Sequence, residues 1–415
     1  MPSQSPDTGK IRFTNYQKFA IAVLSFLQFT VILDFMILSP LGAILLRDLG
    51  MGTSQFGLVV SAYAFSAGIS GLLTAGFADK FDRKRLLLFF YSGFVLGTFL
   101  CGLAPNYRLL LAARIVTGLF GGVIGSISLA IVADLFPLSA RGRVMGFVQS
   151  SFAASQVLGI PVGLFCATRW GWHAPFLLIA AVAAAVGVVI ALRLRPVVGH
   201  LEHRLDRHPL QHLFLTAIRP RYILGFASTI LLATGGFMLM PFGSTFSVHN
   251  LGIALDKLPM VYFVTGLCAL VAGPLVGRLS DSIGKYLTLC LGTFLNIAVI
   301  LYFTRLGITP LWGVLVINIL LFVGISARGV SASALTSGLP TISDRGAYMS
   351  ISSSLQQLSG GVAAWVAGQI VVQSPSGRLE HYEILGFVVT GTMSITMFLM
   401  WFVNQRVGEK ALARG

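Results

Sequence analysis

The chain has 415 residues, of which 55% are hydrophobic and only 10% are charged, and its mean hydropathy is +0.84. Soluble domains carry about 25% charged residues, so this composition excludes an ordinary soluble globular protein. The formal net charge of +15 could suggest nucleic-acid binding. Because the basic residues fall in short loops between apolar segments, no soluble basic face is predicted and that class is excluded as well.

Twelve apolar segments follow one another along the chain, each near the roughly 20 residues that a bilayer-spanning helix needs. The segments cover 17–46, 54–77, 86–104, 108–135, 143–168, 172–194, 222–248, 256–277, 286–304, 309–337, 346–373 and 383–404. With the N-terminus in the cytoplasm, the cytoplasmic loops receive 21 of the 29 Lys and Arg residues and the opposite loops six. This asymmetry predicts a multi-pass protein of the cell (inner or plasma) membrane with both termini cytoplasmic. The polar residues 1–16 and the long first segment do not fit a cleavable signal peptide.

The first segment contains Asp34, the only acid that the hydropathy pattern places in mid-membrane. Arg114 in the fourth segment and Arg328 in the tenth share this situation. An ionised group there costs roughly 2.5–3.5 kcal/mol on insertion scales and usually faces a water-filled path or a buried partner. We expect Asp34 to carry a proton and Arg114 to be its ion-pair partner, which would make the pair the proton-coupling site. A static structural ion pair is the alternative.

The sequence repeats itself at about half its length. GFADKFDRKR (76–85) ends the second segment and GRLSDSIGK (277–285) ends the eighth. ARGRVMGF (140–147) and DRGAYMSI (344–351) form a second matching pair. We therefore expect two six-helix halves, residues 1–194 and 221–415, joined by the Arg- and His-rich linker 195–220, which is predicted to lie in the cytoplasm.

Two six-helix halves with this acidic and basic motif after spans two and eight resemble the major facilitator superfamily. The resemblance implies an all-α membrane protein with twelve transmembrane helices in two pseudo-symmetric six-helix bundles. It also implies a conformational latch on the cytoplasmic side, whose residues here are Asp79, Lys80, Arg83, Arg141, Asp281 and Lys285. The first copy departs from the family pattern at both glycines, with Gly76 one place late and Asp82 where the turn glycine belongs.

Three further motifs are similar to the twelve-helix drug:proton antiporter branch of that superfamily. They are LLLAARIVTGLFGGVIG (109–125), GIPVG (159–163) and GWHAPF (171–176). The resemblance implies a secondary transporter that alternates access around a site between the halves. Its energy source would be the proton gradient, without a cofactor or a metal.

Polar residues in the apolar segments are candidates for contacts with a substrate. Arg328 either binds an anionic group of the substrate or is held by helix carbonyls and water. The other candidates could bind substrate or make interhelical hydrogen bonds; they are Gln28, Tyr63, Gln149, Gln156, Asn318, Gln356 and Gln357.

These observations predict proton-coupled export of a small amphiphilic compound by a monomer whose other partners are protons and membrane lipids. A transporter of an organic anion or another polar metabolite, in either direction, is the alternative, because Asp34, Arg114 and Arg328 together carry a net positive charge. The absence of HExxH, GxSxG and CxxC motifs and of a mid-membrane histidine argues against an enzyme and against a metal site. An intramembrane hydrolase and a transporter-like sensor remain as rivals of a different class.

Overall fold

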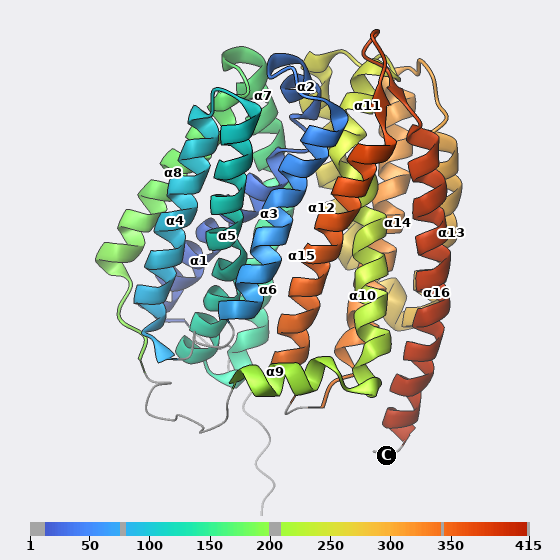
Figure 1. Ribbon diagram of the computed structural model, residues 1–415. Helices are drawn as coiled ribbons and strands as arrows, with labels where there is room; N and C mark the ends of the chain where they lie inside the picture. Colours follow the sequence, from blue (N-terminus) through green and yellow to red (C-terminus); the bar gives the residue numbers. More distant parts are fainter. Residues whose placement is uncertain (1–12, 75–79, 199–208, 342–343, 413–415) are drawn as a thin grey trace, which may run out of the picture.

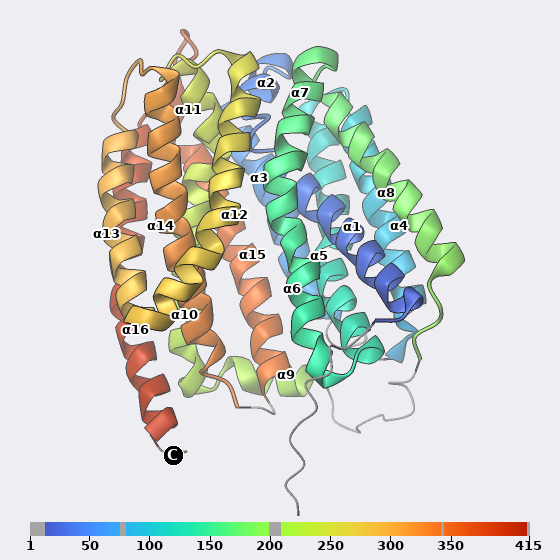
Figure 2. The same cartoon turned by 180° about the vertical axis from the view of Figure 1, so that it is seen from behind.

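The computed structural model describes residues 13–74, 80–198, 209–341 and 344–412. Within these ranges the chain forms two bundles of long helices side by side (Figures 1 and 2). The first bundle, the N half, comprises α1 (Asn15–Ile37), α2 (Gly42–Asp48), α3 (Thr53–Thr74), α4 (Arg83–Leu103), α5 (Tyr107–Leu135), α6 (Leu138–Ala154), a π-helical turn (Ser155–Gly159), α7 (Ile160–Trp170) and α8 (His173–Arg193).

A short helix, α9 (Pro209–Ala217), leads to the second bundle, the C half. This bundle comprises α10 (Pro220–Leu239), a 3₁₀ turn (Met240–Phe242), α11 (Gly243–His249), a second 3₁₀ turn (Leu255–Lys257), α12 (Leu258–Ile283), α13 (Lys285–Phe303), α14 (Leu311–Ser337), α15 (Arg345–Ile370) and α16 (Tyr382–Leu412). The two-residue strands β1 (Val372–Gln373) and β2 (Leu379–Glu380) pair in an antiparallel hairpin before α16. The predicted helical membrane fold is confirmed, with this hairpin as a small addition.

Eleven helical segments of the described chain are long and apolar enough to cross a membrane. The predicted eleventh span, α15, is just as long but carries many Ser, Gly and Gln residues, which lower its hydropathy. This helix packs along α3 of the N half. Its small and polar side chains therefore lie largely inside the molecule, and with α15 the long segments match the twelve predicted ones.

Two predicted spans end earlier than expected. The first, predicted over 17–46, ends as a regular helix at Ile37, and a turn containing Pro40 separates it from α2. In the C half, Pro241 separates α10 from α11 in the same way. Proline lacks the N–H group that the helical hydrogen-bond ladder needs, whereas an average of hydropathy does not register such a break. Asp34 consequently lies in the last turn of α1 and not at its middle.

The two ends of the bundles are packed differently. We call the end that carries α9 and the last turns of α16 the linker face, and the end that carries α2, α11 and the hairpin the hairpin face (Figure 1). The largest hydrophobic cluster includes Phe56 and Phe242, one from each half, and joins the halves near the hairpin face. At the linker face each half has a separate cluster of its own. The hairpin face is therefore sealed while the linker-face ends of the halves pack independently.

Candidate functional site

Asp34 and Arg114 form a fully buried ion pair in the N half. The Nη1 atom of Arg114 lies 2.8 Å from Oδ2 of Asp34, and the two side chains are 1% and 0% exposed, respectively. The same Nη1 donates a hydrogen bond to the backbone carbonyl of Asp34 at 3.3 Å. The contact predicted from the sequence between these two side chains is thus present in the structure.

Two neighbouring helices complete the surroundings of this pair. The hydroxyl of Thr98 on α4 donates to Oδ1 of Asp34 at 3.0 Å. The guanidinium of Arg114 lies over the ring of Tyr63 on α3, with 4.6 Å between Cζ of Arg114 and the centre of the ring. Cations are attracted to aromatic faces at this distance. The Arg114 side chain is therefore held by an acid, a carbonyl and a ring, and Asp34 by an arginine and a hydroxyl.

The spacing of Arg114 and Gly118 on α5 has a direct role in this arrangement. A Cβ atom on Gly118 would lie 2.4 Å from the backbone oxygen of Tyr63. Only glycine lets α3 approach α5 this closely. The motif therefore brings Tyr63 to the arginine as well as supplying the arginine itself.

The pair lies closer to the hairpin face than the sequence pattern suggested. Asp34 is in the last turn of α1, and Arg114 is two turns from the start of α5 at the same face. Contacts between the halves cover this region: Thr53 donates to the carbonyl of Val371 at 2.6 Å, and Ser244 donates to that of Ser39 at 2.9 Å. In this conformation Asp34 is closed off from both faces.

A cavity of about 870 Å³ lies between the halves on the linker side. Its walls come from α1 and α6 of the N half and from the second half of α14, and they carry no charged side chain; the lining residues are Gln28, Ile32, Gln149, Phe152, Gly329, Val330, Ser333, Ala334 and Ser337. The Oε1 atom of Gln28 is buried and has no hydrogen-bond partner in the described chain. An unsatisfied buried acceptor of this kind is a ready contact for a bound molecule.

Arg328 directly precedes Gly329, which lines this cavity, but Arg328 itself is not part of the wall. Its side chain is 4% exposed, and its Nη2 atom makes no hydrogen bond within the described residues. It is placed in the linker-side portion of α14, whereas Asp34 sits near the hairpin face and pairs with Arg114. Asp34 therefore does not serve both arginines.

The remaining polar candidates do not converge on one site. Of the seven, only Gln28 and Gln149 line the cavity. Tyr63 is buried against Arg114, and Asn318 donates to the carbonyl of Val314 in its own helix at 2.8 Å. The last three are Gln156, buried in the π-helical turn against α12, the exposed Gln356 and the half-buried Gln357.

The predicted latch residues lie at the linker face. Asp79 falls outside the described residues. Arg83 pairs with Asp134 of α5 at 3.4 Å, and the Nε atom of Arg141 donates to the carbonyl of Phe136 at 2.9 Å, so both contacts stay inside the N half. Lys80, Asp281 and Lys285 are exposed. A latch across the halves remains a prediction for a conformation in which the linker face is closed.

Sequence reasoning missed Thr98, because a threonine in an apolar helix carries no signal of its own. Such residues commonly bond to their own helix, as Thr117 does to the carbonyl of Ala113. Only the packing of α4 against α1 and α5 shows that the Thr98 hydroxyl faces Asp34. The set of side chains that surrounds the ion pair is therefore decided by tertiary packing and not by the local sequence.

The sequence profile described as Major Facilitator Superfamily matches residues 24–364 and 225–414. The chain belongs to the major facilitator superfamily. It is therefore a multi-pass membrane protein and a secondary transporter, and not an enzyme. This excludes the intramembrane hydrolase considered from the sequence.

Relatives of this superfamily member align over much of its length. An uncharacterized MFS-type transporter, YceJ of Bacillus subtilis, is 28% identical over 274 residues, covering 65% of this chain and 68% of the relative. A probable sugar efflux transporter of Mannheimia succiniciproducens is 25% identical, covering 85% and 86%. Multidrug resistance protein 2 of Bacillus subtilis is 25% identical, covering 67% and 72%.

Two solved transporter structures share the fold at low identity. A bacterial homologue of the human lysosomal transporter Spinster, in an inward-facing and unoccupied conformation, matches with a TM-score of 0.76 at 15% identity, covering 96% of this chain and 99% of that chain. The human organic anion transporter MFSD10 matches with a TM-score of 0.69 at 19% identity, covering 94% and 100%. These matches bear on the architecture alone.

Proposed function

We propose that this superfamily transporter is a proton-coupled exporter in the cell membrane, resembling the drug:proton antiporter branch, with Asp34 as the proton carrier. The observation that carries the proposal is the buried cluster of Asp34, Arg114 and Thr98. Ionisable residues within membrane spans are rare and mark ion pathways. The names of two relatives, one a sugar efflux and one a multidrug resistance protein, support export.

The surroundings of Arg114 explain how the pair can open. Removing one partner of a buried ion pair costs several kcal/mol when the other charge is left bare. When Asp34 takes a proton, Arg114 still has the backbone carbonyl of Asp34 and the ring of Tyr63 beside it. These two contacts lower the cost of neutralising Asp34. The proton can therefore bind and leave while Arg114 keeps favourable contacts.

The excess of Lys and Arg on the linker side supports a cytoplasmic linker face, with both termini on that side. The monomeric state remains a separate expectation from the sequence. The linker-side cavity then opens inward, and the sealed hairpin face is the outer gate. Asp34 lies near that gate, so it would meet external protons when the gate opens. During alternating access, residues 1–194 and residues 221–415 would move against each other as two rigid units, with 195–220 as the linker.

The cavity wall favours an uncharged amphiphilic substrate. Two amides and two hydroxyls, from Gln28, Gln149, Ser333 and Ser337, alternate with apolar side chains, and no formal charge lines the space. Ligand sites typically combine an apolar wall with a few polar groups that orient the molecule. The alternative, an organic anion, is favoured by one observation: Arg328, which precedes the lining residue Gly329, has a buried Nη2 without a hydrogen-bond partner in the described chain.

Substitution of the carrier acid tests the coupling. In proteoliposomes that enclose a pH-sensitive dye, Asp34→Asn should abolish proton movement driven by a solute, while exchange of solute without a gradient continues. Asn keeps the size of the side chain but cannot lose a proton. Asp256→Asn, which removes an exposed acid in the 3₁₀ turn Leu255–Lys257, is the control and should behave as wild type in this assay. Full proton coupling in the Asp34→Asn protein would refute the assignment.

A further inference from the structure

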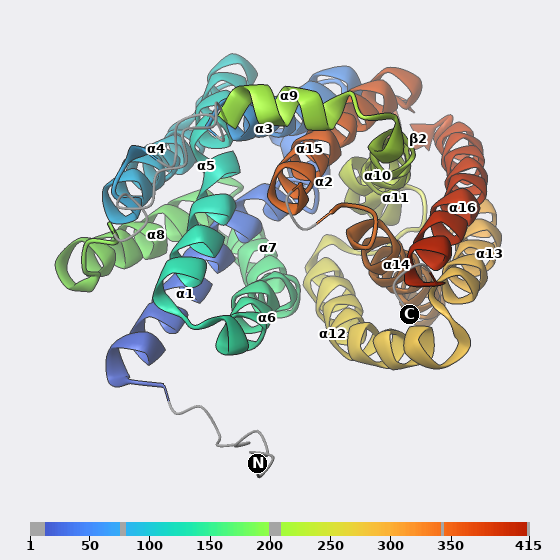
Figure 3. The ribbon, with the colours of Figure 1, turned by 90° about the horizontal axis from the view of Figure 1, so that it is seen from below.

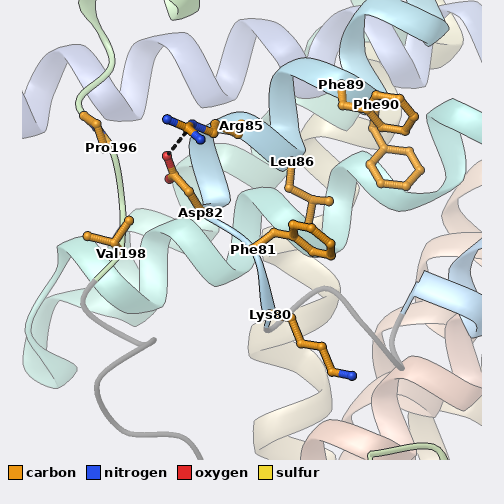
Figure 4. A pocket seen from close by; sticks show the side chains of 9 residues that line it. All are labelled: Lys80, Phe81, Asp82, Arg85, Leu86, Phe89, Phe90, Pro196 and Val198. Atoms are coloured by element: carbon orange, nitrogen blue, oxygen red, sulfur yellow. Dashed lines mark ion pairs between the residues drawn. The ribbon is translucent and has the colours of Figure 1, made fainter.

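A second hollow lies on the outer surface of the N half, away from the cavity between the halves. It has a volume of about 740 Å³ and is formed by the start of α4 and by the segment that follows α8 (Figure 4). The central cavity is instead lined by α1, α6 and α14. We call this hollow the α4 groove; its lining comprises Lys80, Phe81, Asp82, Arg85, Leu86, Phe89, Phe90, Pro196 and Val198.

The α4 groove has an apolar wall that faces away from the protein interior. Phe81 and Phe89 are 52% and 60% exposed, and Phe89 contacts Phe90 edge to face with 5.3 Å between the ring centres. α4 is a membrane-spanning helix, and these aromatic rings belong to its first two turns and the residues just before it. Exposed apolar side chains on a membrane-spanning helix face the acyl chains of the lipid.

The basic residues around the start of α4 divide into two groups. Arg83 pairs with Asp134, and the Nζ atom of Lys84 donates to the carbonyl of Ala191 at 2.8 Å, so both are engaged by the N half itself. Lys80 and Arg85 line the groove instead, and in Figure 4 Phe81 and Leu86 lie between them. Both cations are exposed, Arg85 to 89%. The groove therefore presents two cations on one apolar wall.

Asp82 is the one acid among the described residues that line the groove, and its carboxylate already accepts hydrogen bonds from the protein. Its Oδ1 atom accepts the backbone N–H groups of Lys84 and Val197, each at 3.0 Å, so it caps α4 and holds the chain that leaves α8. Its Oδ2 atom lies 3.9 Å from Nε of Arg85, beyond hydrogen-bond distance. An exposed contact of this length is weak, and Arg85 remains free to bind an anion.

We propose that the α4 groove binds a phospholipid with an anionic headgroup. The headgroup phosphate would contact Lys80 and Arg85 at the rim, and an acyl chain would lie along Phe89 and Phe90. The charge complementarity favours an anionic over a zwitterionic lipid, because basic residues at the membrane surface attract anionic lipids. The apolar wall favours a lipid over a free phosphate compound, which has nothing to place against the phenylalanines.

Lipid retention measured on the full-length protein tests this proposal. The protein is purified in detergent, mixed with phosphatidylglycerol or phosphatidylcholine, and examined by native mass spectrometry. Wild type should retain phosphatidylglycerol, and the double variant Lys80→Gln, Arg85→Gln should bind it about tenfold more weakly or worse. The matched control is Arg278→Gln, Lys285→Gln, which removes two exposed cations near the end of α12 and the start of α13. This control should bind phosphatidylglycerol as wild type does.

Two further experiments distinguish binding of a lipid from binding of a soluble phosphate or from diffuse surface charge. Phe89→Ala should weaken the binding of phosphatidylglycerol although no charge changes, and millimolar glycerol phosphate should not displace the lipid. Equal retention by wild type and the Lys80→Gln, Arg85→Gln variant would overturn the proposal. Equal loss in the two double variants would show diffuse surface charge instead of a site, and displacement by glycerol phosphate would show a site for soluble phosphates. Melting temperatures of lipid-free samples confirm that the variants are folded.

Discussion

At the scale of single residues, three buried charges differ in their partners. Asp34 and Arg114 contact each other, a hydroxyl and a ring, and these contacts offset much of the cost of burial, although Nε of Arg114 has no hydrogen-bond partner in the described chain. Arg328 is almost as buried, its Nη2 has no hydrogen-bond partner among the described residues, and no ion pair with these residues holds it. A group held at such a cost points to function, because most buried polar groups are hydrogen-bonded.

Thr98→Val tests the hydroxyl that sequence reasoning missed. The variant keeps the shape of the side chain but removes the donor to Oδ1 of Asp34, so we expect the protein to lose about 1–3 kcal/mol of stability at pH 7. Thermal unfolding in detergent measures the loss. Thr293→Val is the control, because among the described residues the Thr293 hydroxyl donates only to the carbonyl of Leu289 in its own helix. A Thr98→Val protein as stable as this control would mean that the hydroxyl adds nothing to the cluster.

Substitution of Arg328 separates the two candidate substrate classes. Arg328→Lys should weaken the binding of an anionic ligand and Arg328→Ala should nearly abolish it, because lysine keeps the charge but loses the planar fork that matches carboxylate or phosphate. Uncharged ligands should bind both variants as they bind wild type. Thermal-shift titrations with anionic and uncharged compounds make the comparison. If every ligand found binds wild type and Arg328→Ala equally, the role of Arg328 as an anion anchor is excluded.

At the scale of elements, the two halves repeat a structural break that the hydropathy pattern conceals. α1 and α10 both end shortly before a proline, Pro40 or Pro241, and both are followed by a seven-residue helix, α2 or α11. These two short helices contact each other across the halves at the hairpin face. The break lets each first helix turn and cover the end of the bundle, which a straight helix would leave open.

The start of α15 is fixed by a carboxylate that lies outside the membrane-spanning helices. Asp344 pairs with Arg219 and with His212 of α9, and it accepts hydrogen bonds from the hydroxyls of Tyr222, at 2.7 Å, and Thr341, at 3.0 Å. The Tyr222 bond above all, then Thr341, Arg219 and His212, hold the pKa of Asp344 below its usual range, although burial acts to raise it. This cluster anchors the linker helix beneath α15 (Figure 3).

Asp344→Asn should therefore lower the stability of the protein by about 1–3 kcal/mol at neutral pH. A depressed pKa in the folded state contributes stability above the unfolded value of about 3.9, and this contribution is lost as the pH falls through the folded pKa. The difference from wild type should be full at pH 6–7 and should shrink below about pH 4. Melting temperatures across this range measure it. A difference that stays constant with pH would show that the charge of Asp344 is not what matters.

At the scale of the whole molecule, the two halves meet closely at the hairpin face and separate at the linker face. α3 and α15 come closest near Gly57 and Gly368, where a Cβ on Gly368 would lie 2.8 Å from the backbone oxygen of Thr53. The same two helix ends exchange the bonds from Thr53 to Val371 and from Gln369 to Ser54. The two helices also pack farther along, where Gly68 faces Leu358. At the hairpin face the contact consists of close backbone packing and these two hydrogen bonds between the halves, so it can be broken without unfolding either half.

Gly368→Val should open this contact and shift the population toward the conformation with a closed linker face. The added methyl groups cannot fit against the α3 backbone, and each 1.4 kcal/mol of such bias changes the ratio of the two states about tenfold. Spin-label distances between the halves at the hairpin face should lengthen. Gly391→Val is the matched control, since nothing lies within 4 Å of its added Cβ. Unchanged distances in the Gly368→Val protein would contradict a gate at this position.

The number of spans, their order, the internal repeat and the basic bias of one face could all be predicted from the sequence. These features depend on the length and hydropathy of local segments and on the cost of burying charge, which each segment carries by itself. The pairing of Asp34 with Arg114 was also predictable, because two opposite charges in apolar helices have few other ways to be satisfied. The end of α1 was not predicted, since Pro40 lies within an unbroken apolar run.

Only the tertiary structure decided which polar side chains share a site. Thr98 joins Asp34, Tyr63 joins Arg114, and of the seven polar candidates only Gln28 and Gln149 reach the cavity. The reason is physical: a polar residue in a membrane helix can face its own backbone, a neighbouring helix or a cavity at similar cost, and the rotation of each helix selects among them. That rotation is set by close packing with other helices distant in the chain, which no local pattern records.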